Sequence, residues 1–174
     1  MKRTAIWQLL LVFVLAGCTK GQPSKDPNAV FVDPNAARAG EYGELYFESN
    51  GVRFGVFDET EQVFSSLPDE IAEPFAEKSC AFEGEDVIHY FRGFEITSNV
   101  IDGVARITVI RVLDDTVKTP QGLRIGMTEE DAAAAFPALS EASWKLIDGT
   151  ALLSVTIADG VVKEIVYSAA IEED

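Results

Sequence analysis

Two stretches of this chain repeat one pattern of glycine, arginine and apolar residues. GVRFGVFDET at 51–60 and GLRIGMTEED at 122–131 agree position by position: Gly, apolar, Arg, apolar, Gly, apolar, and then an acidic start. Self-similarity of this kind indicates that one structural unit is built more than once. We therefore predict a single domain over 41–174, with a first copy at about 51–116 and a second at about 119–170.

Each copy begins with the signals of a helix start. Thr128 is followed three residues later by Asp131, and Asp58 is followed by Glu61. Both pairs fit a capping box, and acidic first turns suit the positive end of a helix. Proline cannot continue a helix, so we expect the two helices to stop at the prolines that come next, Pro68 and Pro137.

Strand-like runs follow each predicted helix. Their ranges are 86–91, 94–101 and 104–113 in the first copy, and 144–147, 151–158 and 161–167 in the second. The links between them are Arg92-Gly93, Asp102-Gly103, Asp148-Gly149 and Asp159-Gly160. Asp-Gly between alternating runs is a strong hairpin signal, because the turn needs positive φ. The expected fold class is α+β: two tandem helix-plus-antiparallel-meander units that form one sheet with the helices on one face.

The N-terminus has the anatomy of a secretory signal. Lys2 and Arg3 precede an apolar stretch at 5–16, which is shorter than the roughly 20 apolar residues that span a bilayer. The sequence Leu15-Ala16-Gly17-Cys18 resembles the lipobox of bacterial lipoproteins, whose cysteine is lipidated and becomes the new N-terminus. This resemblance implies a signal peptide at 1–17 and a lipid anchor on Cys18. An ordinary signal peptide with a chance cysteine is the alternative.

The segment after the cysteine is predicted to be a tether. Residues 18–40 are rich in Pro, Gly, Asn, Asp and Ala, and they contain Asp-Pro-Asn-Ala twice. Such a composition buries too little apolar area to offset the entropy of ordering the chain. A flexible spacer that holds the domain away from the membrane is therefore expected, with a recognition motif as the alternative for the repeated tetrapeptide.

The net charge limits the classes of partner. The chain has a formal net charge of -15, which repels phosphate backbones and anionic lipid head groups within the Debye length. Nucleic acid is therefore excluded as a partner, and membrane association is expected only through the lipid anchor. A protein partner at the cell surface or in the envelope remains.

The residue types that carry catalysis or hold metals are scarce. Once Cys18 is lipidated, Cys80 is the remaining thiol and His89 is the single histidine. Cys80 has apolar neighbours and is expected to be a small buried residue. The alternative is a nucleophile that uses His89 as its base, across a turn at 83–85. So few nitrogen and sulfur ligands argue against a metal site of that kind, and no cofactor motif is present.

Carboxylates are plentiful and form four clusters. None of the clusters has the spacing of a calcium loop. Helix capping and solvated turns account for them, whereas acid/base work by paired carboxylates would make the protein a small envelope hydrolase. We expect no enzyme activity. The clusters are Asp58, Glu59 and Glu61; Glu83, Glu85 and Asp86; Asp114 and Asp115; and Glu129, Glu130 and Asp131.

Aromatic residues of the predicted strands are the candidates for a binding surface. The run 87–91 is apolar on both faces, so its second face is either covered by a helical segment at 68–79 or exposed as an apolar patch. His89 and Phe91 share one side of their strand, and Trp144 opens the corresponding strand of the second copy. We predict that these three residues contribute to a protein-binding surface. In the alternative, Phe91 and Trp144 are core residues.

The second helix start also carries a family resemblance. GLRIGMTEED, read as Gly-Met-Thr that opens a helix before a three-stranded meander, resembles the repeat unit of the β-lactamase-inhibitor-protein-like fold. It is also similar to the small lipoprotein of the outer-membrane β-barrel assembly machinery. The resemblance covers about residues 45–170. It implies helices on one face of an antiparallel sheet, with the other face or the loops binding a protein. Together these features predict a lipid-anchored, extracytoplasmic protein that presents a non-enzymatic interaction domain.

Overall fold

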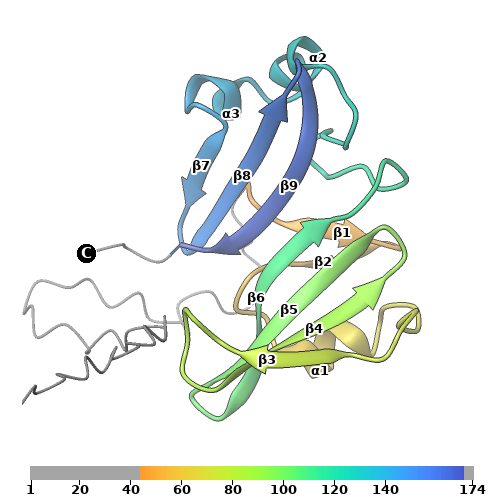
Figure 1. Cartoon of the computed structure of the whole chain (residues 1–174), viewed down its shortest axis with the longest axis vertical. Coiled ribbons are helices and arrows are strands. Elements are labelled where there is room, and N and C mark those ends of the chain that lie inside the picture. Colours follow the sequence, from red (N-terminus) through yellow and green to blue (C-terminus); the bar gives the residue numbers. More distant parts are fainter. Residues whose placement is uncertain (1–43, 171–174) are drawn as a thin grey trace, which may run out of the picture. The chain divides into compact units, whose positions relative to one another are not determined.

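A computed structural model describes residues 44–170 of the chain. The predicted signal peptide, Cys18 and the tether lie outside these residues. Within them, seven strands form one antiparallel sheet in the order β3-β4-β5-β6-β9-β8-β7, and β1 and β2 form a separate two-stranded sheet (Figure 1). Two meanders, β3 to β6 and β7 to β9, meet where β6 pairs with β9.

The described residues are mostly β-structure, with short helices. The strands are β1 (Phe47–Ser49), β2 (Val52–Phe54), β3 (Phe75–Lys78), β4 (Glu85–Phe91), β5 (Phe94–Ile101), β6 (Val104–Val112), β7 (Lys145–Asp148), β8 (Ala151–Ala158) and β9 (Val161–Ala169). The helices are α1 (Thr60–Phe64), α2 (Glu129–Ala135) and α3 (Pro137–Glu141). All six predicted strand runs are confirmed, with small shifts at their ends.

The predicted turns at Arg92-Gly93, Asp102-Gly103 and Asp159-Gly160 are confirmed, whereas Gly149 and Thr150 form the β7-β8 turn, because Asp148 still pairs with Ala151. Asp102 and Gly103 both have positive φ, at 53° and 79°, and so do Asp159 and Gly160, at 54° and 70°. Two consecutive left-handed residues are what a type I′ turn requires, and Asp-Gly tolerates them better than most pairs. The local chemistry of these turns therefore fixes the β5-β6 and β8-β9 hairpins.

The helical part of the domain was overestimated. The segment at 68–79 was expected to be helical, but it contains β3, whose four residues pair with β4 from Phe75↔Ile88 to Lys78↔Glu85. The edge of β4 offers backbone hydrogen bonds that an isolated short helix cannot match. As predicted, α2 ends before Pro137, with Phe136 as its C-cap, but Pro137 then opens a further short helix, α3. Proline is well suited to the first turn, where its missing N–H has no intrahelical acceptor.

One of the two predicted helix caps is confirmed. The Thr128 side chain accepts a hydrogen bond from the Asp131 N–H at 3.1 Å, at the start of α2. The Asp58 cap is wrong: Glu59 holds the N-cap position of α1 without a side-chain cap bond. Asp58 lies one residue too early, and its carboxylate accepts the Gly55 N–H at 2.8 Å, within the turn before the helix.

Removing the Thr128 cap should produce a small, measurable loss of stability. Thr128→Ala should lower the free energy of unfolding by about 1 kcal/mol, because the Asp131 N–H loses its side-chain acceptor. Thr128→Ser keeps the oxygen and should remain close to the parent chain. Urea unfolding of the three proteins measures the difference. Equal losses in both variants would show that the hydrogen bond contributes nothing.

The core lies on one face of the seven-stranded sheet. Ile96, Ile110, Tyr167 and Leu153 form a cross-strand row from β5 to β8, and each is at most 1% exposed. We call this side the core face. The β1-β2 hairpin packs on it, since the Phe47 ring lies 5.0 Å from the Phe94 ring and 5.9 Å from the Tyr167 ring. The hairpin and α1 lie behind the sheet in the view of Figure 1.

Tyr167 links the core to the start of the described chain. Its hydroxyl donates to Gln121 Oε1 at 2.5 Å, and Gln121 Nε2 donates to the Glu44 carbonyl at 2.6 Å. Burial raises the pKa of the Tyr167 hydroxyl above its usual value, because the phenolate would be desolvated. The protonated phenol is therefore the form that the folded chain holds.

The raised pKa predicts a loss of stability at alkaline pH. Tyr167 ionises in the unfolded chain at a pH of about 10, so its contribution is complete below that pH and falls as the pH rises further. We expect one of the four tyrosines to ionise only together with unfolding. A tyrosinate absorbance titration alongside circular dichroism measures this, and Tyr167→Phe should remove that one phase. Ionisation of all four tyrosines while the chain stays folded would contradict it.

Candidate protein-binding surface

The register of the strands identifies one row of side chains that crosses the whole sheet. Residues directly opposite one another on neighbouring strands point to the same face. Starting from Phe75 in β3, each residue of the row pairs with the next as far as β7. Because the core-face row lies one residue away on each strand, this row points to the opposite face. We call it the outer row: Phe75, Ile88, Thr97, Val109, Ser168, Leu152 and Ile147.

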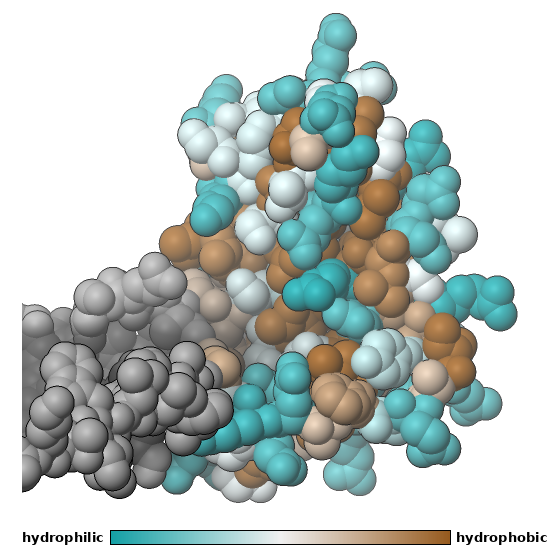
Figure 2. Space-filling model, viewed as in Figure 1, coloured by the Kyte–Doolittle hydropathy of each residue, from teal (hydrophilic) through white to brown (hydrophobic). Residues whose placement is uncertain are grey.

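The outer row is apolar or weakly polar and accessible along its length. It contains no ionisable side chain. Its two ends, Phe75 and Ile147, are 53% and 64% exposed and lie on the two edge strands, and the five residues between them are half-buried. Figure 2 looks onto the sheet from the side opposite β1, β2 and α1, and it shows hydrophobic residues (brown) between hydrophilic ones (teal). Exposed apolar surface with a polar surround is typical of binding sites.

Charged residues flank the outer row on the same face. Arg111 lies in the neighbouring row and makes ion pairs with Glu95 at 3.4 Å and with Glu164 at 3.6 Å. The Arg111 side chain is 47% exposed, so these pairs contribute little to stability. They give the apolar row the polar border that protein interfaces usually have.

The three residues predicted for a binding surface lie on the core face. His89 and Phe91 share one side of β4, as predicted, but the prediction that this side is open is wrong for Phe91. Phe91 is 2% exposed, and its ring is stacked on Phe94 at 5.1 Å with an interplanar angle of 11°. Trp144 is half-buried and packs against the core. The core alternative therefore holds for Phe91, and the accessible side of β4 is the side of Ile88.

The outer row was missed because it depends on register. Its members come from seven strands, and each is unremarkable within its own strand. Two bulges, at Thr97/Ser98 and Thr156/Ile157, shift the pairing within the β5-β6 and β8-β9 hairpins. A bulge inserts an extra residue and changes which side chains share a face. The available signal was the alternation in β8, where Leu152 falls between the buried residues Ala151 and Leu153.

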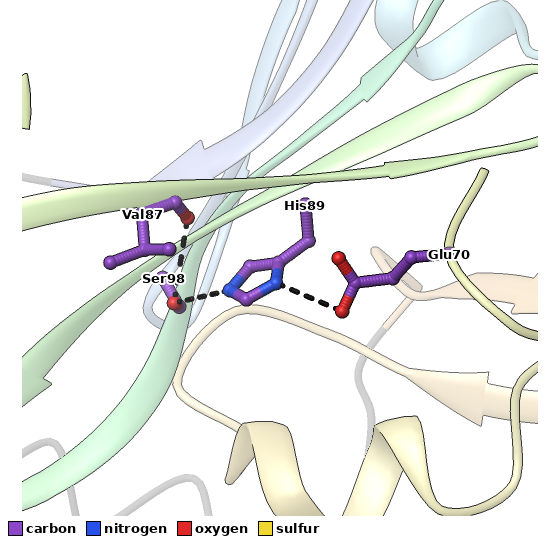
Figure 3. Close-up of polar contacts among 4 residues, drawn as sticks. All are labelled: Glu70, Val87, His89 and Ser98. Carbon is purple, nitrogen blue, oxygen red and sulfur yellow. Dashed lines mark hydrogen bonds and ion pairs between the residues drawn. The ribbon is translucent and has the colours of Figure 1, made fainter. Parts of the chain in front are cut away.

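A second cluster brings together a serine, the histidine and a glutamate on the core face. His89 Nε2 lies 3.1 Å from Ser98 Oγ, and His89 Nδ1 lies 3.3 Å from Glu70 Oε1 (Figure 3). The order of groups is that of a nucleophile, a base and a residue that orients the base. A nucleophile has to reach its substrate, however. Ser98 is 4% exposed, and the Phe64 ring lies against His89 at 4.7 Å.

The geometry of this cluster fits a structural role. Glu70 lies in the loop between α1 and β3, and the neighbouring Ile71 N–H donates to the Tyr90 carbonyl at 2.8 Å. His89 therefore holds that loop against β4 while its other nitrogen contacts β5. Both ring nitrogens are occupied in this way.

Cys80 and the carboxylate clusters also differ from a catalytic site. The expectation that Cys80 is buried is wrong: it is exposed, in the irregular link between β3 and β4, where Ser79 takes the buried position. Among residues 44–170, no group of three or more histidine, cysteine and acidic residues could hold a metal ion. The Asp114 carboxylate accepts hydrogen bonds from Thr116 within its own turn, and these bonds lower the pKa of the Asp114 carboxyl.

A cleft opens at one end of the core face. Its volume is about 520 Å³, and its floor includes the stacked Phe91 and Phe94 rings. The walls come from the β1-β2 turn, the loop before β3, the β4-β5 turn and the segment after β6. The remaining lining residues are Ser49, Asn50, Pro68, Asp69, Ile71, Arg92, Thr116 and Val117. The lining is mixed in polarity and contains one acidic and one basic residue, Asp69 and Arg92, so its charge favours no single class of ligand.

Comparison with known proteins gives no family assignment. No family model, curated protein or solved structure matches the chain. No helix within the described part of the chain is long and apolar enough to cross a membrane. What the protein does therefore has to follow from the geometry of the sheet and from the motifs of the sequence.

Proposed function

We propose that this chain is a lipid-anchored protein of the bacterial cell envelope whose domain binds another protein through the outer row. The observation that carries the proposal is the row itself: one side chain from each of seven strands, in register, with no ionisable group among them. The domain acts as an interaction module, without catalysis of its own.

The size of the outer row suits a specific interface. Neighbouring strands lie about 4.8 Å apart, so seven strands give a row roughly 29 Å long. A standard protein interface buries about 800 Å² on each partner, which corresponds to a patch about 28 Å across. An apolar centre of this length inside a charged border has the usual layout of such interfaces.

A two-copy architecture links the domain to the family resemblance. The Phe57 N–H bonds the Ile107 carbonyl at 2.7 Å, and the Gly126 N–H bonds the Val162 carbonyl at 2.8 Å. Phe57 and Gly126 both have positive φ, at 69° and 80°. These hydrogen bonds support two equivalent helix starts in which Phe57 corresponds to Gly126. The sequence match instead aligns Gly55 with Gly126, so the two alignments differ by two residues.

The strand pairing supports the same architecture. The β5-β6 and β8-β9 hairpins both carry a bulge at the corresponding place. At the β6-β9 junction, Ile110↔Tyr167 and Arg111↔Val166 are the two central pairs. Helices on one face are part of this proposal, because each helix contributes a side chain to the core cluster: Val63, Ala132 and Leu139. In the resembled fold, the face of the sheet opposite the helices or the loops bind another protein.

The lipid anchor is the part of the proposal that a single substitution tests. Cys18→Ala should abolish lipid attachment, because the thiol that receives the lipid is gone, and two acyl chains are what stable anchoring requires. Intact-mass analysis and detergent partitioning of both proteins measure the outcome. Unchanged membrane association and unchanged leader processing in the variant would show that Cys18 is an ordinary residue.

A further inference from the structure

We infer that the partner of the outer row is a protein surface that places lysine or arginine side chains beside the β3-β4 end of the row. This inference rests on the proposed function and adds the chemistry and orientation of the partner. It starts from the residues next to Phe75 and Ile88 on the same face. Two positions further along their strands, Glu77 in β3 stands directly opposite Asp86 in β4.

The Glu77–Asp86 pair is unfavourable for the isolated domain. Like charges directly opposite one another on neighbouring strands repel. No lysine, arginine or histidine of the described chain makes an ion pair with either carboxylate, whereas Glu95 and Glu164 on the same face both pair with Arg111. Among the described residues, the β3-β4 end of the outer row therefore carries two facing carboxylates without a cationic partner.

A buried amide holds one of these carboxylates in place. Asn99 is 2% exposed, and its Nδ2 donates to Asp86 Oδ1 and to the Glu85 carbonyl, both at 3.0 Å. Its Oδ1 is buried without a hydrogen-bond partner among the described residues. An unsatisfied buried acceptor destabilises a fold. The Nδ2 hydrogen bond thus fixes the position of the Asp86 carboxylate, on the strand position that pairs with Glu77.

A basic protein surface is the occupant that this arrangement fits. A second copy of the chain would bring a net charge of -15 against an equal charge, and anionic lipid head groups would be repelled in the same way. A cationic side chain at Glu77 and Asp86 would relieve their repulsion while apolar side chains of the partner cover the row. Charge pairs of this kind set the orientation and the association rate of a complex.

A displayed library of random peptides provides the probe. The full chain, in detergent micelles, is used to select binders. We expect the selected sequences to combine apolar residues with more Lys and Arg than the starting library. Glu77→Gln with Asp86→Asn should weaken their binding about tenfold, and added salt should weaken binding to the parent chain. Glu129→Gln with Glu130→Gln, a matched change on α2, should leave binding unchanged.

The outcomes separate this inference from the proposed function. Selected peptides that lose binding on Phe75→Ser but show no basic excess and no response to the Glu77/Asp86 variant would overturn the inference alone. An empty selection, or binders indifferent to Phe75→Ser and to Ile147→Ser, would overturn the proposed function as well. Self-association of the chain in analytical ultracentrifugation, lost on Phe75→Ser, would replace the basic partner with a second copy. The Glu77/Asp86 variant should not unfold more easily than the parent chain.

Discussion

Phe91→Ala should lower the free energy of unfolding by about 3–5 kcal/mol. The side chain is 2% exposed, and its ring packs between Phe94 at 5.1 Å and Phe64 at 5.4 Å. Truncation removes apolar area from the core and leaves a cavity beside two rings whose backbones are fixed by the sheet and by α1. Loss of this size is a large part of the total stability of a domain.

The same substitution at Phe75 is the matched control. Phe75 is 53% exposed at the edge of the sheet, so Phe75→Ala should change stability by no more than about 0.5 kcal/mol. Thermal or urea unfolding of both variants measures the contrast. If the two alanine variants unfolded alike, the assignment of one face as core and the other as surface would be wrong.

Ile147→Asp should weaken binding of the proposed envelope partner about thirtyfold or more, which corresponds to the loss of one interface hot spot. The side chain is 64% exposed at the β7 end of the outer row, so a carboxylate there is solvated in the free domain and desolvated in the complex. Co-isolation of the partner from native envelopes, quantified by mass spectrometry, measures the effect. The melting temperature should stay unchanged.

Val100→Asp is the control for this second prediction. Val100 is 61% exposed but lies at the tip of the β5-β6 hairpin, outside the outer row. The two substitutions add the same charge and remove similar exposed side chains. Equal loss of the partner in both variants would attribute the effect to charge or solubility, and would remove the outer row from the binding surface.

Local chemistry explains why the strands and hairpins could be predicted from the sequence. A type I′ turn needs two consecutive residues with positive φ, and Asp-Gly at 102–103 and 159–160 adopts this conformation. The two turn residues themselves meet this requirement, so the turn can be predicted without knowledge of distant contacts. Residues 68–79 could not be predicted in the same way. Their pairing as β3 depends on the open edge of β4, which is a tertiary contact, and the two prolines in the segment disfavour a long helix without specifying a strand.

The candidate site shows the same division. That His89 and Phe91 lie on one side of β4 follows from the period of a strand. Which side is buried does not, because Ile88 and Tyr90 are as apolar as their neighbours. The choice is made by Phe64 of α1 and by the β1-β2 hairpin, which cover the side of Phe91. The outer row then depends on strand order and on two bulges, and neither is encoded in a local motif.

Site-specific photocrosslinking in the native envelope tests the binding surface most directly. A photoreactive amino acid is placed at Ile147 or Phe75 in the outer row, and in a control protein at Glu130, which is exposed on α2. The proposed function predicts that both outer-row positions crosslink to the same envelope protein and that Glu130 does not. Crosslinks to that protein from Glu130 but from neither outer-row position would contradict the assignment of the open sheet face as the binding surface.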